Sequence, residues 1–171
     1  KEAHKIGNVH LAASSKDEGY TYVPLGDEID YPKDVAYLHL TSNNTIKGTQ
    51  YHEFPNSGSV PLICDMSSDI LSHQMDFNQF DMFYAGAQKN LGPSGVTLVV
   101  MLDDMLERIN DGLPTIFDYR THTEKKSLFN TPPSFTIYVV KLILEWIQGQ
   151  GGLKAVEDNN RKKKDVIYDL I

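Results

Sequence analysis

Lys89 is the residue of this sequence whose surroundings most suggest chemistry. It follows the apolar run 82–85 and the small residues Gly86 and Ala87, and it precedes the turn 91–95. Small neighbours let a flat ligand approach the backbone, and burial of a lysine lowers the pKa of its amine, which frees the neutral nucleophile. Lys89 is therefore a candidate for Schiff-base formation with a carbonyl compound. Taken alone, an ordinary loop lysine is the commoner interpretation of such a pattern.

Apolar runs on both sides of Lys89 predict the strands that would position it. They occupy residues 9–14, 35–40, 60–64, 82–85 and 96–102, with a short further strand at 50–53. Sixteen residues (66–81) separate the third run from the fourth, which is enough for the crossover between parallel strands. Only eight (88–95) separate the fourth run from the fifth, so that strand is expected to be reversed. The pattern predicts an α/β fold with a mostly parallel mixed sheet.

Helices are expected mainly in the second half of the chain. Asp103 is a candidate cap for a short helix over 104–110, which Gly112 would end. The segment 114–131 is expected to be irregular. Ser134 is a candidate cap for a helix over 135–148, and a glycine-rich break separates it from a final helix that begins near residue 153. The helix over 135–148 has apolar residues at helical spacing, namely Ile137, Val140, Ile143, Leu144 and Ile147.

Three polar groups follow predicted strands or turns where a ligand would gather. Ligands bind outside the carboxyl ends of parallel strands, and Thr45, Asp65 and Lys89 are placed there. If the strands before Asp65 and Lys89 are neighbours, their backbones lie about 4.8 Å apart, and a planar cofactor would bridge the two side chains. Pyridoxal phosphate fits, because a lysine holds its aldehyde and a carboxylate keeps its pyridine nitrogen protonated. By itself, Asp65 would more often be a helix cap or an ion-pair partner.

The composition excludes several classes of function. A net charge of −7 argues against general nucleic-acid affinity, and 40% hydrophobic with 23% charged residues is typical of globular proteins. The basic run 161–164 has acidic neighbours and is interpreted as a solvated helix face. One cysteine and six histidines without metal-ligand spacing predict no metal site and a reducing, cytoplasmic setting. No apolar stretch is long enough to predict a membrane span.

The motifs of this chain resemble those of the phosphoserine aminotransferases, which are class-V aminotransferases of pyridoxal-phosphate fold type I. The similar segments are 38–46, 64–68, 84–90, 92–95, 129–133 and 145–152, and the resemblance runs essentially from residue 1 to 171. It implies that Lys89 is the Schiff-base lysine, which also transfers the proton, and that Asp65 pairs with the pyridine nitrogen.

The resemblance also implies further cofactor contacts. Thr45 would contact the cofactor ring, and Gln88 would lie at the cofactor phosphate. Asn130 and Thr131 would reach the phosphate of the neighbouring subunit's cofactor, which implies a homodimer with shared active sites. Without the resemblance, these two residues would be interpreted as an ordinary turn. Two prolines follow them and would stiffen the loop.

The expected activity is transamination between L-glutamate and 3-phosphohydroxypyruvate, giving O-phospho-L-serine and 2-oxoglutarate. Residues 1–171 would be the central part of the cofactor-binding large domain of a longer enzyme. The upstream phosphate loop, the stacking aromatic residue, the substrate arginines and the C-terminal small domain would lie outside them. This piece alone is expected to be inactive. The alternatives are another fold-type I aminotransferase, such as a serine- or alanine:glyoxylate enzyme, and a non-catalytic fragment.

Overall fold

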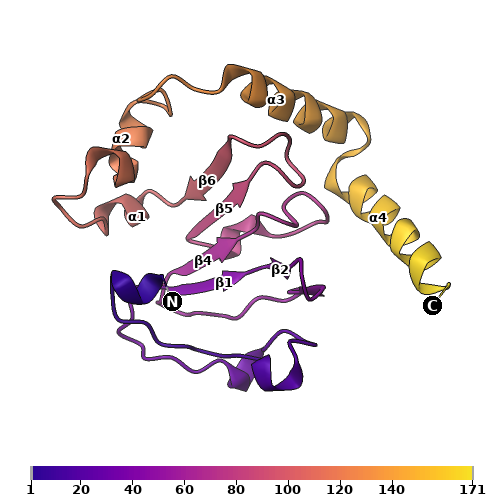
Figure 1. Ribbon diagram of the computed structural model, residues 1–171, viewed down its shortest axis with the longest axis horizontal. Helices are drawn as coiled ribbons and strands as arrows, with labels where there is room; N and C mark the ends of the chain where they lie inside the picture. The colour runs from indigo at the N-terminus through magenta and orange to yellow at the C-terminus, as the bar shows by residue number, and fades with distance from the viewer. Residues whose placement is uncertain (1, 171) are drawn as a thin grey trace.

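The chain builds a four-stranded mixed sheet. We describe it from a computed structural model covering residues 2–170, so Lys1 and Ile171, the ends of the expected span, lie outside the described residues. The sheet order is β1-β4-β5-β6 (Figure 1). Its strands are β1 (Leu38–Thr41), β4 (Leu62–Asp65), β5 (Met82–Gly86) and β6 (Thr97–Met101). The first three run parallel and β6 is antiparallel to β5, which confirms the mostly parallel sheet with one reversed strand.

One face of this sheet carries the core. Leu62 and Cys64 of β4 pack there with Phe83 of β5, and the intervening residues Ile63 and Asp65 point to the opposite face because side chains alternate along a strand. Aromatic rings close the core: Phe54, from the segment after β3, meets Phe80 of the β4–β5 crossover edge to face at 4.8 Å, and Phe77 of the crossover lies 5.1 Å from the Phe83 ring of β5. The other members of the cluster are Leu38, Val60, Met66, Ile70, Ala85, Ala87 and Leu91.

Short elements connect the strands. A second sheet is the hairpin of β2 (Asn43–Asn44) and β3 (Thr49–Gln50), which leaves the end of β1 directly. The crossover from β4 to β5 contains only a single turn of 3-10 helix, η4 (Phe77–Gln79), so the expectation of no long helix there is confirmed. The other 3-10 turns are η1 (Ala3–Lys5), η2 (Lys16–Glu18), η3 (Gly26–Glu28) and η5 (Thr115–Phe117).

The helices follow the sheet in the chain and lie around it (Figure 1). They are α1 (Asp104–Glu107), α2 (Tyr119–Glu124), α3 (Ser134–Gly149) and α4 (Gly152–Tyr168). The α3 helix packs on the turn after Lys89, where a Cβ added to Gly92 would lie 3.1 Å from Val140 Cγ2. The α4 helix is tied to the crossover because Gln74 N–H donates to Glu157 Oε2 at 3.1 Å and Asn160 Nδ2 donates to the Ser72 carbonyl at 2.8 Å.

Several local expectations are wrong. Residues 9–14 form no strand; Asp30 N–H donates to the Ala12 carbonyl at 2.9 Å, and His10 Nε2 lies 3.0 Å from the Asp30 carbonyl oxygen. Asp103 is in helical conformation and does not cap α1, and Ser134 lies inside α3 rather than before it. The segment expected to be irregular contains α2, whose Asp118 side chain accepts from Arg120 N–H.

Two further expectations concern the helix surfaces. Only part of the apolar stripe of α3 packs inward: Ile147 is buried and Val140 and Ile143 are half-buried, whereas Ile137 and Leu144 are each 45% exposed. The basic run 161–164 is exposed on α4, and Arg161 pairs with Glu157 at 3.0 Å, as expected for a solvated face. No helix within residues 2–170 combines the length and apolar character needed to cross a membrane.

Candidate functional site

The strand register places Asp65 at the centre of the carboxyl edge of the sheet. Asp65 is the last residue of β4 and lies opposite Thr41 of β1 and Tyr84 of β5. Lys89 follows the end of β5 by three residues, after Gly86. The strands before Asp65 and Lys89 are therefore parallel neighbours, which is the condition under which we expected a planar cofactor to bridge the two side chains.

Thr45 and Lys89 meet, although 44 residues separate them. Lys89 Nζ donates a hydrogen bond to Thr45 Oγ1 at 3.1 Å. Thr45 lies at the tip of the β2–β3 hairpin, where Asn44 Oδ1 accepts from the N–H groups of Ile46 and Lys47, both at 3.2 Å. The expected burial of Lys89 is wrong: β5 ends at Gly86, and the following turn carries the lysine side chain into an exposed position.

Asp65 is held by the turn that follows it, and within residues 2–170 it has no basic ion-pair partner. Its Oδ1 accepts from Ser67 N–H at 2.9 Å, and Ser67 Oγ accepts from Gly86 N–H at 3.1 Å. Met66 N–H donates to the Tyr84 carbonyl at 2.8 Å, so the turn is fastened to β5 along its length. The carboxylate is half-buried and caps its own turn, whereas the amine of Lys89 binds the hairpin.

Two residues beside Asp65 were not singled out from the sequence. Tyr84 is the cross-strand partner of Asp65, and its hydroxyl lies 3.0 Å from His39 Nε2 of β1. Burial, and next the negative charge of Asp65, raise the pKa of Tyr84 to about 12. The alternation of side chains along the strands could have identified them, because His39, Asp65 and Tyr84 share the sheet face opposite the core.

Gln88 folds over the end of β5. A Cβ added to Gly86 would lie 2.6 Å from Gln88 Oε1, so a glycine here lets the amide group approach the backbone closely. The side chain of Gln88 is exposed beside Lys89. Its expected position at a cofactor phosphate stays a prediction.

Asn130 and Thr131 lie outside the Thr45–Asp65–Lys89 group. They are exposed in the connection from α2 to α3, and within residues 2–170 no hydrogen bond joins their side chains to Thr45, Asp65 or Lys89. Their expected role concerns a neighbouring subunit and stays a prediction.

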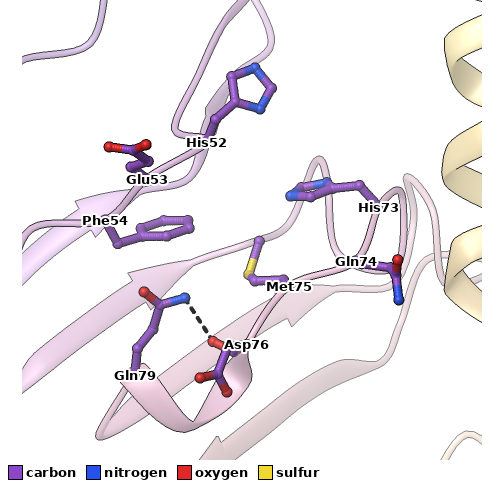
Figure 2. A pocket seen from close by; sticks show the side chains of 8 residues that line it. All are labelled: His52, Glu53, Phe54, His73, Gln74, Met75, Asp76 and Gln79. Carbon is purple, nitrogen blue, oxygen red and sulfur yellow. Dashed lines mark hydrogen bonds between the residues drawn. The ribbon is translucent and has the colours of Figure 1, made fainter.

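Two clefts lie away from this group. The first, of about 390 Å³, is lined by residues of the segment after β3 and of the crossover: His52, Glu53, Phe54, His73, Gln74, Met75, Asp76 and Gln79. Figure 2 shows that the imidazole rings and carboxylates do not converge on one point; Gln79 Nε2 donates to the Asp76 carbonyl at 2.7 Å. No group of three histidine, cysteine, aspartate or glutamate residues in the described chain is arranged to hold a metal.

The second cleft, of about 510 Å³, lies on the sheet face opposite the core. Met82 and Met101 line its floor, and Met105, Arg108 and Tyr119 contribute from the segments after β6. Neither cleft contains Thr45, Asp65 or Lys89. The candidate site is therefore an open edge of the sheet, where two turns and a hairpin converge.

Comparisons with known proteins agree with this geometry. The family model described as aminotransferase class-V matches residues 2–171. A curated phosphoserine aminotransferase of Geobacillus kaustophilus is 58% identical over 171 residues, which are 100% of this chain and 47% of that protein. That of Bacillus subtilis is 52% identical over 170 residues, 99% of this chain and 47% of its own length. The chain thus spans about half the length of the curated relatives it matches.

Solved structures are similar to the same extent. A phosphoserine aminotransferase from Bacillus circulans subsp. alkalophilus superposes with a TM-score of 0.95 at 54% identity, covering 98% of this chain and 46% of that one. A pyridoxal-phosphate-bound phosphoserine aminotransferase from Trichomonas vaginalis superposes with a TM-score of 0.81 at 36% identity, covering 87% and 44%. These likenesses extend over nearly all of the sheet and the helices described above.

Proposed function

This chain belongs to the aminotransferase class-V family, and from that premise we propose that its full-length protein is a phosphoserine aminotransferase that uses pyridoxal phosphate. The observation that carries the proposal is the contact of Lys89 Nζ with Thr45 Oγ1 at 3.1 Å, beside the strand that ends in Asp65. An amine, a hydroxyl and a carboxylate from three separate segments thus gather at one edge of the sheet. Relatives with this name, 48 to 58% identical, support it.

The residues of this edge fit the chemistry of that cofactor. When bound, pyridoxal phosphate supplies the electron sink that makes loss of the substrate α-proton feasible. Lys89 is the only lysine among the converging groups and would hold the cofactor covalently through Nζ. After release, the same amine would take the proton from the substrate α-carbon.

The neighbouring groups would orient the cofactor. The Asp65 carboxylate would accept a hydrogen bond from a protonated pyridine nitrogen, for which one oxygen is already fixed by Ser67 N–H. Thr45 would contact the ring, and Gln88 would contact the phosphate from its position over Gly86. Gly86 has no side chain, which lets the Gln88 amide approach the backbone at the end of β5 closely.

The proposed reaction transfers the amino group of L-glutamate to 3-phosphohydroxypyruvate, giving O-phospho-L-serine and 2-oxoglutarate. The proposal places residues 1–171 in the central part of the cofactor-binding large domain. It also includes a homodimer in which exposed Asn130 and Thr131 reach the neighbouring subunit's cofactor phosphate. The single cysteine, Cys64, is buried and unpaired, which supports a reducing compartment such as the cytoplasm.

The test is to map where the cofactor attaches. The natural full-length protein is mixed with pyridoxal phosphate, reduced with borohydride and digested, and the labelled peptide is identified by mass spectrometry. We expect label on Lys89, and Lys89→Ala should lose it. Lys47→Ala is the matched control, because Lys47 is an exposed lysine of the hairpin that carries Thr45, and its Nζ lies 5.6 Å from the centre of the Tyr20 ring. Label that persists in Lys89→Ala at the wild-type level would refute the proposal.

A further inference from the structure

A buried carboxylate that no step above uses lies beneath the candidate site. Asp69 is 3% exposed, in the turn that follows Asp65. Its Oδ1 accepts a short hydrogen bond from Ser42 Oγ, and its Oδ2 accepts one from Gln50 Nε2 at 3.1 Å. Burial of a carboxylate is costly unless its oxygens are bonded, and here both donors are neutral side chains rather than a cation.

The two donors stand at the base of one hairpin. Ser42 lies between β1 and β2, and Gln50 belongs to β3, where it pairs with Asn43 of β2. Ser42 is fully buried, and its N–H donates to the Asp65 carbonyl at 3.0 Å. Asp69 therefore holds both strands of the hairpin to the turn that presents Asp65.

Neighbouring contacts strengthen this attachment. Asn43 Nδ2 donates to Ser68 Oγ at 2.9 Å, and Ser68 Oγ donates in return to the Asn43 carbonyl at 2.8 Å. At the other end of the hairpin, Gly48 N–H donates to the Asn44 carbonyl at 2.8 Å, with Gly48 at a φ of +72° that suits glycine. Both base and tip are thus fixed, and the tip carries Thr45.

We propose that Asp69 is a positioning residue for the cofactor site, acting through the hairpin to hold Thr45 against Lys89. The inference rests on the proposed function, since it concerns the same site. A carboxylate suits this position because it has two acceptor oxygens and no proton to donate, so one side chain bonds the hydroxyl of Ser42 and the amide of Gln50 together. An apolar residue there would pack but would remove both of these bonds, and the base of the hairpin would then be held by Ser42 N–H and by the Asn43–Ser68 pair.

The first test is a double-mutant cycle on cofactor affinity in the natural full-length protein. Asp69→Ala should weaken binding of pyridoxal phosphate about tenfold to a hundredfold, the range expected when one or two hydrogen bonds to a charged group are lost. In a Thr45→Ala background the same substitution should change the affinity less than about twofold, because the group it positions is absent. An equal loss in both backgrounds would overturn the proposal and leave Asp69 a merely structural residue.

The second test measures the hairpin without the cofactor. Gln50→Ala removes one of the two bonds at a half-buried position and serves if Asp69→Ala does not fold. In the apo protein, hydrogen exchange should become faster in residues 42–51 and stay unchanged in β6. Asp76→Ala is the control, since Asp76 bonds only Asn78 and Gln79 of its own turn. Unchanged exchange in 42–51 would contradict the anchoring role even if the protein bound no cofactor, so this result is separate from failure of the proposed function.

Discussion

Asp65→Asn should lower the pKa of Tyr84, because the charge of Asp65 is one of the reasons that this pKa is high. The structure places the two residues opposite each other on β4 and β5, and the pKa of Tyr84 is raised to about 12, first by burial and then by the Asp65 carboxylate. Asparagine is nearly isosteric and can still accept the bond from Ser67 N–H at Oδ1. The substitution therefore removes the charge and keeps the turn.

Asp65→Asn should reverse only part of the rise in the pKa of Tyr84. Burial is the largest cause and is unchanged by Asp65→Asn, so Tyr84 should still titrate above 10.0. We expect a decrease of the order of one pKa unit, which is a tenfold increase in the phenolate fraction at a fixed alkaline pH. The assay is NMR of protein labelled at the tyrosine ¹³Cζ position, with the Tyr84 resonance assigned by its loss in Tyr84→Phe. Because the wild-type pKa is about 12, the phenolate fractions of wild type and variant are compared at the same pH up to about pH 11.5.

The control is Asp81→Asn. Asp81 bonds the opposite end of β4, where its Oδ2 accepts from Leu62 N–H at 2.7 Å, and it should leave the Tyr84 titration unchanged. A Tyr84 pKa that is identical in wild type and Asp65→Asn would refute the electrostatic argument. It would mean that the Asp65 side chain does not contribute to the raised pKa of Tyr84.

Two further predictions concern Cys64 and the shared site. Burial raises the pKa of the Cys64 thiol to about 12, so iodoacetamide should not label it at pH 8 until the protein is unfolded. The folded-state pKa of the Cys64 thiol lies above the unfolded-state value of about 9, so its contribution to stability is complete below pH 9 and is lost as pH rises toward 12. Cys64→Ala should therefore make the melting temperature fall less steeply over that pH range. If each site takes Lys89 from one subunit and Asn130 from the other, mixing Lys89→Ala with Asn130→Ala subunits should recover about a quarter of wild-type activity. The reason is that half of the dimers would be mixed and that one of the two sites in each mixed dimer would have both residues intact. No recovery would mean that both residues serve one subunit's own site.

The sheet could be predicted because its signals are local. The apolar runs 60–64, 82–85 and 96–102 coincide with β4, β5 and β6 within two residues, and the lengths of the connections gave the correct directions. The run 9–14 was also predicted to be a strand but forms none. Composition reports that a segment can be extended, whereas a strand also needs a partner edge, and that depends on the rest of the fold.

Helix ends were predicted less well for a related reason. Asp103 and Ser134 are residue types that favour caps, but the chain is already helical at Asp103. Ser134 is the first residue of α3, and Pro133 occupies the cap position that we expected Ser134 to take. The six residues of α2 lack a long apolar stripe and follow Pro114, so neither periodicity nor composition indicated them.

The sequence indicated candidate reactive residues but not their surroundings. Lys89 bonds Thr45, and Asp65 ends the strand that pairs with β5, but their roles at a cofactor stay predictions. The exposure of Lys89 and the contacts of Tyr84 with His39 depend on where each turn leaves the sheet, which a motif does not specify. Asp69 was hidden for another reason: an aspartate in a serine-rich turn is usually solvated, and only the fold of the hairpin buries it.

Asp65 and Thr45 should respond differently to substitutions around them, because different interactions hold them in place. Backbone pairing fixes Asp65, since residues 63–65 pair with 82–84 whatever side chains they carry on the open face. Thr45 has no such support: its hairpin has only two paired residues on each strand and depends on side-chain bonds from Ser42, Gln50 and Ser68. Substitutions on the open sheet face should therefore change the electrostatics around Asp65 without moving it. Substitutions of the neutral residues Ser42, Gln50 and Ser68 should move Thr45 without changing the charge of the site.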